Sequence, residues 1–222
     1  MLTPRKRITK KQLKEDKLVT LYAKSRDWVE ANFKLVSGAA AVILLLIVGS
    51  FFISNAQQKA EVTASTKLAK AINAFDSSDY TTAINILSDI VENSQRTKSA
   101  ALARLYLGQA LYRTNEYSGA MEHFRVAARR LGRDVHLKTT ALAGEAACME
   151  QQGQFAQAAK KYETIVRKYP EAPQASYFLL RSARCYELAQ DSEKATELYQ
   201  KLAEDYPNTR EKDDALLLNA MR

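Results

Sequence analysis

Residues Leu35–Ser54 read LVSGAAAVILLLIVGSFFIS, a run without any charged side chain, and no charge occurs between Lys34 and Lys59. At about 1.5 Å rise per residue, a helix of this length reaches about 30 Å, the hydrocarbon thickness of a bilayer. We therefore predict a single transmembrane helix over residues 35–55, followed by a juxtamembrane linker over residues 56–61. The two flanks of this run then belong to different compartments.

The head of the chain, residues 1–34, is strongly basic, with ten Lys and Arg against four acids, whereas the remainder carries 23 bases and 21 acids. Because an excess of Lys and Arg beside a span stays in the cytoplasm, the head is expected to be a basic cytoplasmic tail. The chain beyond residue 56 would then be periplasmic, with the span in a bacterial inner membrane. A nucleic-acid partner is not expected, because the bases are mixed with apolar residues such as Trp28 and Phe33, a composition typical of an amphipathic helix near anionic lipid.

A cleaved signal peptide is the alternative interpretation of the apolar run, since Ser54-Asn55-Ala56 resembles a small-x-small cleavage site. Secretory signals usually combine a short positive region with an apolar core of roughly 7–15 residues. Both the leader and the apolar core are longer here, which favours an uncleaved anchor. No cysteine directly follows the run, so a lipoprotein anchor is not expected.

The tail repeats itself every 37 or 38 residues. One column of small residues consists of Ala83, Ala120, Ala158 and Ala195. Bulky residues stand four places later, at Leu87, Phe124, Tyr162 and Tyr199. A second small column stands twelve places before the first, at Ala71, Gly108, Ala146 and Ala183. Prolines close two units, as Lys168-Tyr169-Pro170 and Asp205-Tyr206-Pro207.

These columns predict units of two antiparallel helices, in which small residues let the backbones approach and the bulky residue fills the space beside them. Polar clusters mark the turns within the units, at residues 76–79, 114–116, 152–154 and 190–192. Four pairs are expected over about residues 62–206. The segment Thr209–Met221, with Ala215 and Leu216–Leu218 as its apolar face, is expected to be a capping helix. The predicted fold is therefore all-α, a transmembrane helix followed by an α-solenoid, with a generic helical bundle as the alternative.

The columns Gly108/Ala120/Phe124 and Ala146/Ala158/Tyr162/Pro170 resemble the tetratricopeptide repeat, whose usual period is near 34 residues. The longer period here is expected to extend the loops between units. The whole layout resembles the YfgM-type inner-membrane proteins, ancillary to the SecYEG translocon, and the repeat domain, residues 62–222, is similar to that of the CpoB-type proteins. The resemblance implies a protein-binding scaffold that joins the Sec translocon to periplasmic chaperones. A structural accessory subunit of another membrane or envelope-assembly complex is the alternative.

The resemblance also implies that the first helix of each pair lines a concave binding face. The residues expected on that face are Leu102, Tyr106, Gln109, Tyr112, Arg113, Thr140, Ala143, Glu150, Gln151, Tyr177, Arg181, Arg184 and Glu187. Tyr and Arg contribute most often to binding energy at protein interfaces. The cluster Tyr177/Arg181/Arg184 is therefore the strongest candidate, whereas an ordinary solvated helix face is the simpler interpretation of the others.

Nothing in the sequence indicates a catalytic, cofactor or metal site. His123 and His136 are isolated, and the chain has neither a Gly-rich phosphate loop nor a nucleophile elbow. We therefore do not expect an enzyme. Cys148 and Cys185 occupy equivalent positions in successive repeats, on helices about 10 Å apart. A disulfide needs Cα atoms within about 7 Å, which favours two free packing residues, with a bridge as the alternative.

Overall fold

The computed structural model describes the backbone of residues 10–221 and the side chains of residues 19–221. Over this range the chain forms ten α-helices and no strand, which confirms the predicted all-α fold. The chain divides into two units, one that ends at Ala56 and one that begins at Gln57. The first basic residues of the predicted cytoplasmic tail, those before residue 10, lie outside the described part of the chain.

The first unit contains α1 (Lys10–Ala31) and the first part of α2 (Phe33–Asp76). Among the residues described, α2 alone is long and apolar enough to cross a membrane, with an apolar window of mean hydropathy 2.6 that is 0% buried. This lack of burial distinguishes it from the core helix of a soluble protein, while a signal sequence near the N-terminus can also be long and apolar enough. Residues 56–61, the expected linker, are helical and belong to α2.

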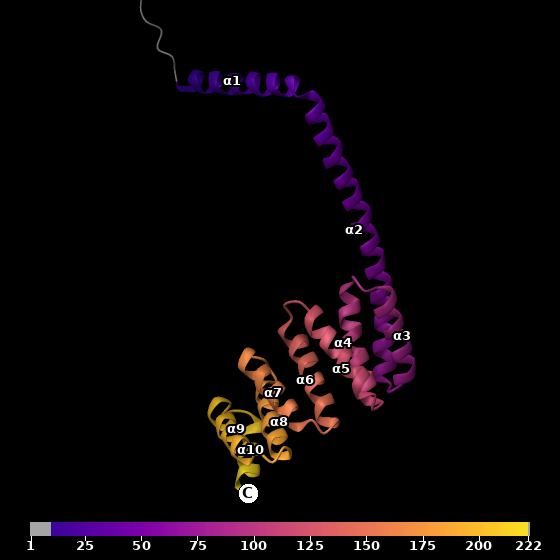
Figure 1. Ribbon diagram of the computed structural model, residues 1–222, viewed down its shortest axis with the longest axis vertical. Coiled ribbons are helices and arrows are strands. Elements are labelled where there is room, and N and C mark those ends of the chain that lie inside the picture. Colours follow the sequence, from indigo (N-terminus) through magenta and orange to yellow (C-terminus); the bar gives the residue numbers. More distant parts are fainter. Residues whose placement is uncertain (1–9, 222) are drawn as a thin grey trace, which may run out of the picture. The chain divides into compact units, whose positions relative to one another are not determined.

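The second unit is a row of antiparallel helix pairs (Figure 1). The pairs are the C-terminal part of α2 with α3 (Tyr80–Asn93), α4 (Lys98–Arg113) with α5 (Tyr117–Arg130), α6 (Val135–Gln151) with α7 (Phe155–Lys168), and α8 (Ala175–Leu188) with α9 (Ser192–Asp205). A last helix, α10 (Arg210–Ala220), packs against α9 and α8. The four predicted pairs and the final helix are confirmed.

The long period of the repeat does not lie in the loops alone. Helices α4 and α6 have 16 and 17 residues, whereas each second helix of a pair, from α3 to α9, has 14. The loops between units were expected to be extended, and residues 169–174 do form a six-residue loop between α7 and α8. In α4 and α6 the additional residues instead lengthen the first helix of the pair, whereas α8 has 14 residues.

The turn inside each pair repeats one backbone geometry. One residue in each turn has a positive φ, namely Ser78 at 63°, Asn115 at 65°, Gly153 at 74° and Gln190 at 64°. The next N–H reaches back over the helix end, as from Asp79 to the carbonyl of Ala74 and from Gln154 to that of Met149, both at 2.9 Å. These bonds satisfy carbonyls that a helix end leaves unpaired. Since only the third pair has glycine here, the other three turns hold a side chain in the left-handed region.

Side-chain caps fix where the helices begin. Asp79, Asp134 and Asp191 each accept a hydrogen bond from the backbone N–H three residues later, at 3.0–3.1 Å. Helix α4 has a further cap from a distant residue, because the Glu61 carboxylate on α2 accepts the N–H groups of Lys98 at 2.7 Å and Ser99 at 3.1 Å. The first pair is thereby joined to the second by polar contacts as well as by its core.

The predicted columns form the core of the second unit. The bulky residues are almost fully buried, with exposed fractions of 0% for Leu87, 3% for Phe124, 2% for Tyr162 and 1% for Tyr199. A Cβ atom at Gly108 would lie 2.9 Å from the ring of Phe124, and one at Gly144 on α6 would lie 2.6 Å from it. Phe124 is thus held between glycines of two first helices. The repeat columns identified Gly108 and missed Gly144.

The apolar face predicted for the last helix is correct only in part. Ala215 is buried and Leu218 packs against the core, but Leu216 and Leu217 are 48% and 62% exposed. The reason is geometric, because successive residues of an α-helix are turned by about 100°, so a continuous run cannot share one face. Of the four residues predicted for the apolar face, Ala215 and Leu218 pack against the end of the array.

Candidate functional site

The first helices of successive pairs border a cavity of about 480 Å³, which we call the aromatic cavity. Helices α4, α6 and α8 supply most of its wall. Its aromatic side chains are Phe75, Tyr112, Phe124, Tyr162, Tyr177 and Phe178. The rings of Tyr162 and Phe178 stack with centroids 6.3 Å apart, and Tyr177 meets Phe178 edge-on at 5.9 Å. A wall of this kind can bury apolar side chains of a ligand while limiting their orientation.

Two polar residues that line the aromatic cavity have groups without a described partner. Arg113, at the C-terminal end of α4, is exposed and has no ion pair with any described side chain. The Oε1 atom of Gln174, just before α8, is buried and accepts no hydrogen bond within the described part of the chain. An unpaired buried acceptor costs free energy that a hydrogen bond from a ligand N–H would recover.

A third polar group, Arg181, is already paired. Its Nη2 atom lies 2.5 Å from the Glu150 carboxylate, and the two side chains are only 24% and 16% exposed. Its guanidinium carbon lies 5.9 Å from the ring centroid of Tyr177. Although burial lowers the pKa of Arg181, the hydrogen bond and charge of Glu150 raise it above its ordinary value. Arg181 is therefore a permanent cation, neutralised by Glu150, that supports the ring of Tyr177.

The hydroxyl of Tyr112 is likewise engaged. Burial raises the pKa of Tyr112, and a hydrogen bond with Gln151 acts in the opposite direction. Its ring meets that of Tyr117 edge-on at 5.4 Å. Phe75 and Tyr80 make the corresponding contact at 5.4 Å across the preceding turn. The aromatic residue that follows each of these turns therefore helps to hold an aromatic side chain of the cavity wall.

The structure places about half of the residues expected on the concave face in the aromatic cavity. Those that line it are Gln109, Tyr112, Arg113, Thr140, Ala143, Tyr177 and Arg181. Glu150 and Gln151 stand behind this wall, as the partners of Arg181 and Tyr112. They therefore act on the wall rather than forming it.

The remaining expected residues do not line this cavity. Tyr106 packs edge-on against Phe75 with centroids 5.7 Å apart. Arg184 is exposed on α8, about two turns beyond Tyr177. Glu187 accepts a hydrogen bond from the hydroxyl of Tyr199 at 2.7 Å and so joins α8 to α9. Leu102 lines a separate surface hollow beside Glu61 and Lys98.

Sequence reasoning missed the back of the cavity. Phe124 and Tyr162 were identified only as packing residues, although their rings also reach the cavity from the second helices. Gly144 carried a usable signal, because a glycine inside a helical pattern often marks a close approach of neighbouring atoms. Gln174, in the loop before α8, carried none.

The described residues offer little reactive chemistry. They contain no group of three or more His, Cys, Asp or Glu that could hold a metal ion. Cys148 and Cys185 are free, as predicted, and buried, and burial raises the pKa of each thiol to about 12. Thiols of this kind are poor nucleophiles at neutral pH. Burial also lowers the pKa of His123, whose Nδ1 atom has no described partner. The rings of the aromatic cavity are suited to burying apolar groups of a ligand.

Comparisons with known proteins agree with this architecture. A family model described as a tetratricopeptide repeat-like domain matches residues 26–169, and a tetratricopeptide repeat model matches residues 150–209. A comparison with curated proteins gives no match. The tetratricopeptide fold is typically a non-catalytic scaffold for protein interactions.

Solved structures share the fold at low sequence identity. A tetratricopeptide repeat protein from Parabacteroides merdae has a TM-score of 0.58 at 16% identity, over 68% of this chain and 57% of that chain. A putative kinesin light chain of Podosopora anserina, with nearly identical TPR-like repeats, has a TM-score of 0.57 at 17% identity. The match covers 71% of this chain and 87% of that chain. A MamA RS-1 ArsTM double mutant has a TM-score of 0.54 at 17% identity, over 66% of this chain and 76% of that chain. This chain thus spans 57% of the length of the Parabacteroides protein. Because the first family model covers well over half of the chain, the protein belongs to the tetratricopeptide repeat-like domain family, whose repeats indicate a protein-binding scaffold.

Proposed function

We propose that the chain is a membrane-anchored scaffold that holds a segment of a protein partner in the aromatic cavity. The observation that carries the proposal is the combination of a wall of six aromatic rings with an unpaired acceptor, Gln174, and an unpaired cation, Arg113. Aromatic and Arg side chains dominate the binding energy of protein interfaces. A segment with apolar side chains, a backbone N–H for Gln174 and an acidic group for Arg113 matches these features.

The anchor is the apolar part of α2. Its exposed apolar side chains and its mean hydropathy of 2.6 support a span over residues 35–55 rather than a soluble helix. The excess of Lys and Arg in residues 1–34 supports a cytoplasmic N-terminus. In a bacterium the repeat domain, residues 62–222, is then on the periplasmic side of the inner membrane.

The proposed partners follow from the resemblance to the YfgM-type proteins. The chain would be ancillary to the SecYEG translocon and would bring periplasmic chaperones to proteins that emerge from it. The basic head, the span and the external repeat array together support this assignment. The rival is a structural accessory subunit of another membrane or envelope-assembly complex, which predicts a different stoichiometric partner.

Topology and partner can be tested with the full chain in cells. Protease added to intact spheroplasts should digest the repeat domain and spare the head, because only the repeat domain would face the periplasm. Purification in mild detergent should recover the translocon, and replacing residues 35–55 by an unrelated spanning sequence should abolish this recovery. Protection of the repeat domain from protease contradicts the orientation, and recovery of another stoichiometric complex in place of the translocon selects the rival.

The role of the aromatic cavity needs its own variants. Tyr177→Ala combined with Arg113→Ala removes an exposed ring and the unpaired cation, and is expected to weaken partner recovery at least tenfold, since hot-spot residues contribute about 2 kcal/mol or more each. Leu188→Ala combined with Arg184→Ala is the matched control, because it removes an exposed apolar side chain and an exposed Arg on α8 outside the cavity. Equal recovery with both pairs would place binding elsewhere on the chain.

A further inference from the structure

A second cavity, of about 440 Å³, lies between α5, α6 and α7 and shares no lining residue with the aromatic cavity. We call it the basic cavity. Five cationic side chains line it, Arg125, Arg129, Lys138, Lys161 and Lys168. Glu145 is the only carboxylate in the lining. This charge imbalance is unusual in a tail whose acids and bases are nearly equal in number.

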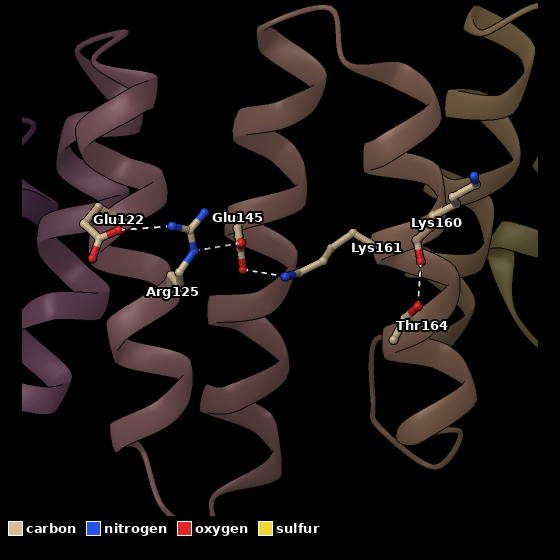
Figure 2. A network of polar contacts seen from close by, with 6 residues as sticks. All are labelled: Glu122, Arg125, Glu145, Lys160, Lys161 and Thr164. Atoms are coloured by element: carbon tan, nitrogen blue, oxygen red, sulfur yellow. Dashed lines mark hydrogen bonds and ion pairs between the residues drawn. The ribbon is translucent and has the colours of Figure 1, made fainter.

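Glu145 is occupied by two of the five cations. Its side chain is only 4% exposed, and its two oxygens contact Arg125 Nε at 3.3 Å and Lys161 Nζ at 2.6 Å. Figure 2 shows this carboxylate on α6 between the cation on α5 and the cation on α7. Arg125 makes a further ion pair with Glu122, from Nη1 to Oε2 at 3.2 Å. The carboxylates therefore fix the positions of Arg125 and Lys161, which retain N–H donors that these contacts do not use.

The other three cations have no such partner. Among the side chains that the structure describes, none forms an ion pair with Arg129, Lys138 or Lys168. Lys138 donates to the backbone carbonyl of Gly132 at 3.2 Å, and Lys168 lies 5.6 Å from the ring centroid of Tyr169. Three unpaired cations around one hollow repel one another, so a bound anion would be stabilised by all of them.

The donor set favours a particular anion. Guanidinium groups bind oxyanions through paired N–H donors, and ammonium groups act as compact charges, a combination that matches the several oxygens of a phosphate group. The Tyr169 hydroxyl can add one more donor at the rim. Ala128 and Leu142 line the same cavity and offer an apolar surface to the body of a phosphorylated molecule.

From these contacts we infer that the basic cavity is a binding site for a phosphate-bearing small molecule, either a soluble phosphate ester or the phosphate of a lipid headgroup. The site is separate from the proposed protein-binding site and does not depend on it. Arg129 and Lys168 contact the ligand, while Glu145 is a positioning residue that acts through Arg125 and Lys161.

The test is calorimetric titration of the full chain in neutral detergent, at fixed salt, with two probes. Inorganic pyrophosphate represents the soluble source, and short-chain dihexanoyl phosphatidylglycerol represents the headgroup source. Saturable binding of pyrophosphate alone identifies a soluble ligand, and tighter binding of the lipid identifies a headgroup. Binding of neither probe would overturn the inference.

Variants locate the bound probe. Arg129→Gln combined with Lys168→Gln removes two unpaired cations and is expected to weaken probe binding by about tenfold or more. Lys160→Gln combined with Arg167→Gln removes the same charge from exposed positions of α7 outside the cavity and should leave affinity within about threefold. An equal loss of probe affinity in the two double variants would show that the probe is attracted by the general positive charge, and would contradict a defined site.

Two further measurements guard against misfolding and against a macromolecular ligand. Arg129→Lys combined with Lys168→Arg keeps the charge and should retain saturable binding, which separates lost contacts from lost structure. Pyrophosphate should also raise the melting temperature of the unmodified chain, because a ligand that binds only the folded state stabilises it. A short single-stranded oligonucleotide that binds more tightly than either probe, with equal contributions from both pairs of positions, would overturn the small-molecule assignment.

Discussion

The aromatic cavity and the basic cavity lie in the same helical array and differ in how their charges are satisfied. In the aromatic cavity the partly buried cation, Arg181, is neutralised by Glu150 at 2.5 Å, only the exposed Arg113 has no described ion pair, and the wall is mostly rings. In the basic cavity one carboxylate, Glu145, contacts two cations, and Arg129, Lys138 and Lys168 have no described ion pair. Because Arg181 is paired with Glu150, the ring-lined wall of the aromatic cavity is suitable for apolar side chains. Because three cations of the basic cavity have no described ion pair, that cavity is suitable for an anion.

The difference follows largely from which helix of a pair supplies the charged or aromatic side chains. First helices supply four of the six rings of the aromatic cavity, whereas the second helices α5 and α7 supply four of the five cations of the basic cavity. A repeat keeps its packing columns constant and leaves the positions between them free to vary. Two sites of different chemistry can therefore coexist without altering the core.

The largest effect is expected from filling the back of the aromatic cavity. Gly144→Leu should destabilise the fold by about 3 kcal/mol, because its Cβ alone would approach the ring of Phe124 to 2.6 Å. Gly108→Leu should destabilise the fold in the same way, because a Cβ at this position would lie 2.9 Å from the ring of Phe124. The measurement is chemical denaturation of the full chain in detergent, followed by circular dichroism.

Gly119→Ala is the matched control for the glycine variants. Its Cβ would meet Leu111 at 3.5 Å, an ordinary contact, and alanine favours helix over glycine by about 0.5–1 kcal/mol. We expect a small gain in stability. A loss as large as that of Gly144→Leu would contradict the helix register.

The next largest effect tests the wall of the basic cavity. Glu145→Gln should destabilise the fold by about 1–3 kcal/mol, because Arg125 and Lys161 would lose their shared carboxylate. Glu122→Gln removes an exposed partner of the same Arg125 and should change stability by less than about 1 kcal/mol. Similar losses for the two variants would show that burial of Glu145 has no energetic weight.

A smaller effect separates the paired Arg of one cavity from an unpaired Arg of the other. Arg181→Gln should cost about 1–2 kcal/mol, since it leaves the mostly buried Glu150 without its cation. Arg129→Gln should be within about 0.5 kcal/mol of the unmodified chain, because its side chain is exposed and unpaired. If neither substitution changed the free energy of unfolding, the proposed difference between the paired Arg181 and the unpaired Arg129 would be contradicted.

The smallest effect concerns the buried thiols. Because burial raises the pKa of Cys148 and Cys185 from 9.0 to about 12, their contribution to stability is present below pH 9 and is lost as the pH rises towards 12. The unmodified chain should therefore lose stability more steeply between pH 9 and 11 than Cys148→Ala combined with Cys185→Ala. Equal slopes in thermal melts would show that these thiols ionise as readily in the folded chain as in the unfolded one.

The helix pairs could be predicted from the sequence because their signals are local or periodic. The columns through Ala120 and Ala158 place the close approaches, and the polar clusters place the turns to within a residue or two. The apolar face of α10 was overestimated because a run of leucines was read without its helical rotation. Gly144 was missed because it stands outside the columns.

The chemistry of the cavities was less accessible to sequence reasoning. Arg181 and Tyr177 could be nominated by residue type, but the pairing of Arg181 with Glu150 joins residues on different repeats. The same holds for Glu145 and Arg125, which lie on successive repeats, whereas Lys161, the second partner of Glu145, lies on the other helix of the same pair. Such contacts depend on the stagger between neighbouring helices, which spacing within one segment does not determine.

The central claim, that a protein segment is held in the aromatic cavity, can be tested most directly by site-specific photocrosslinking in living cells. A photoreactive amino acid at position 177, in the cavity wall, should form an adduct with a discrete protein partner, while the same group at position 167, on the exposed side of α7, should not. Adducts of equal yield at both positions, or an adduct at position 167 alone, would contradict the claim.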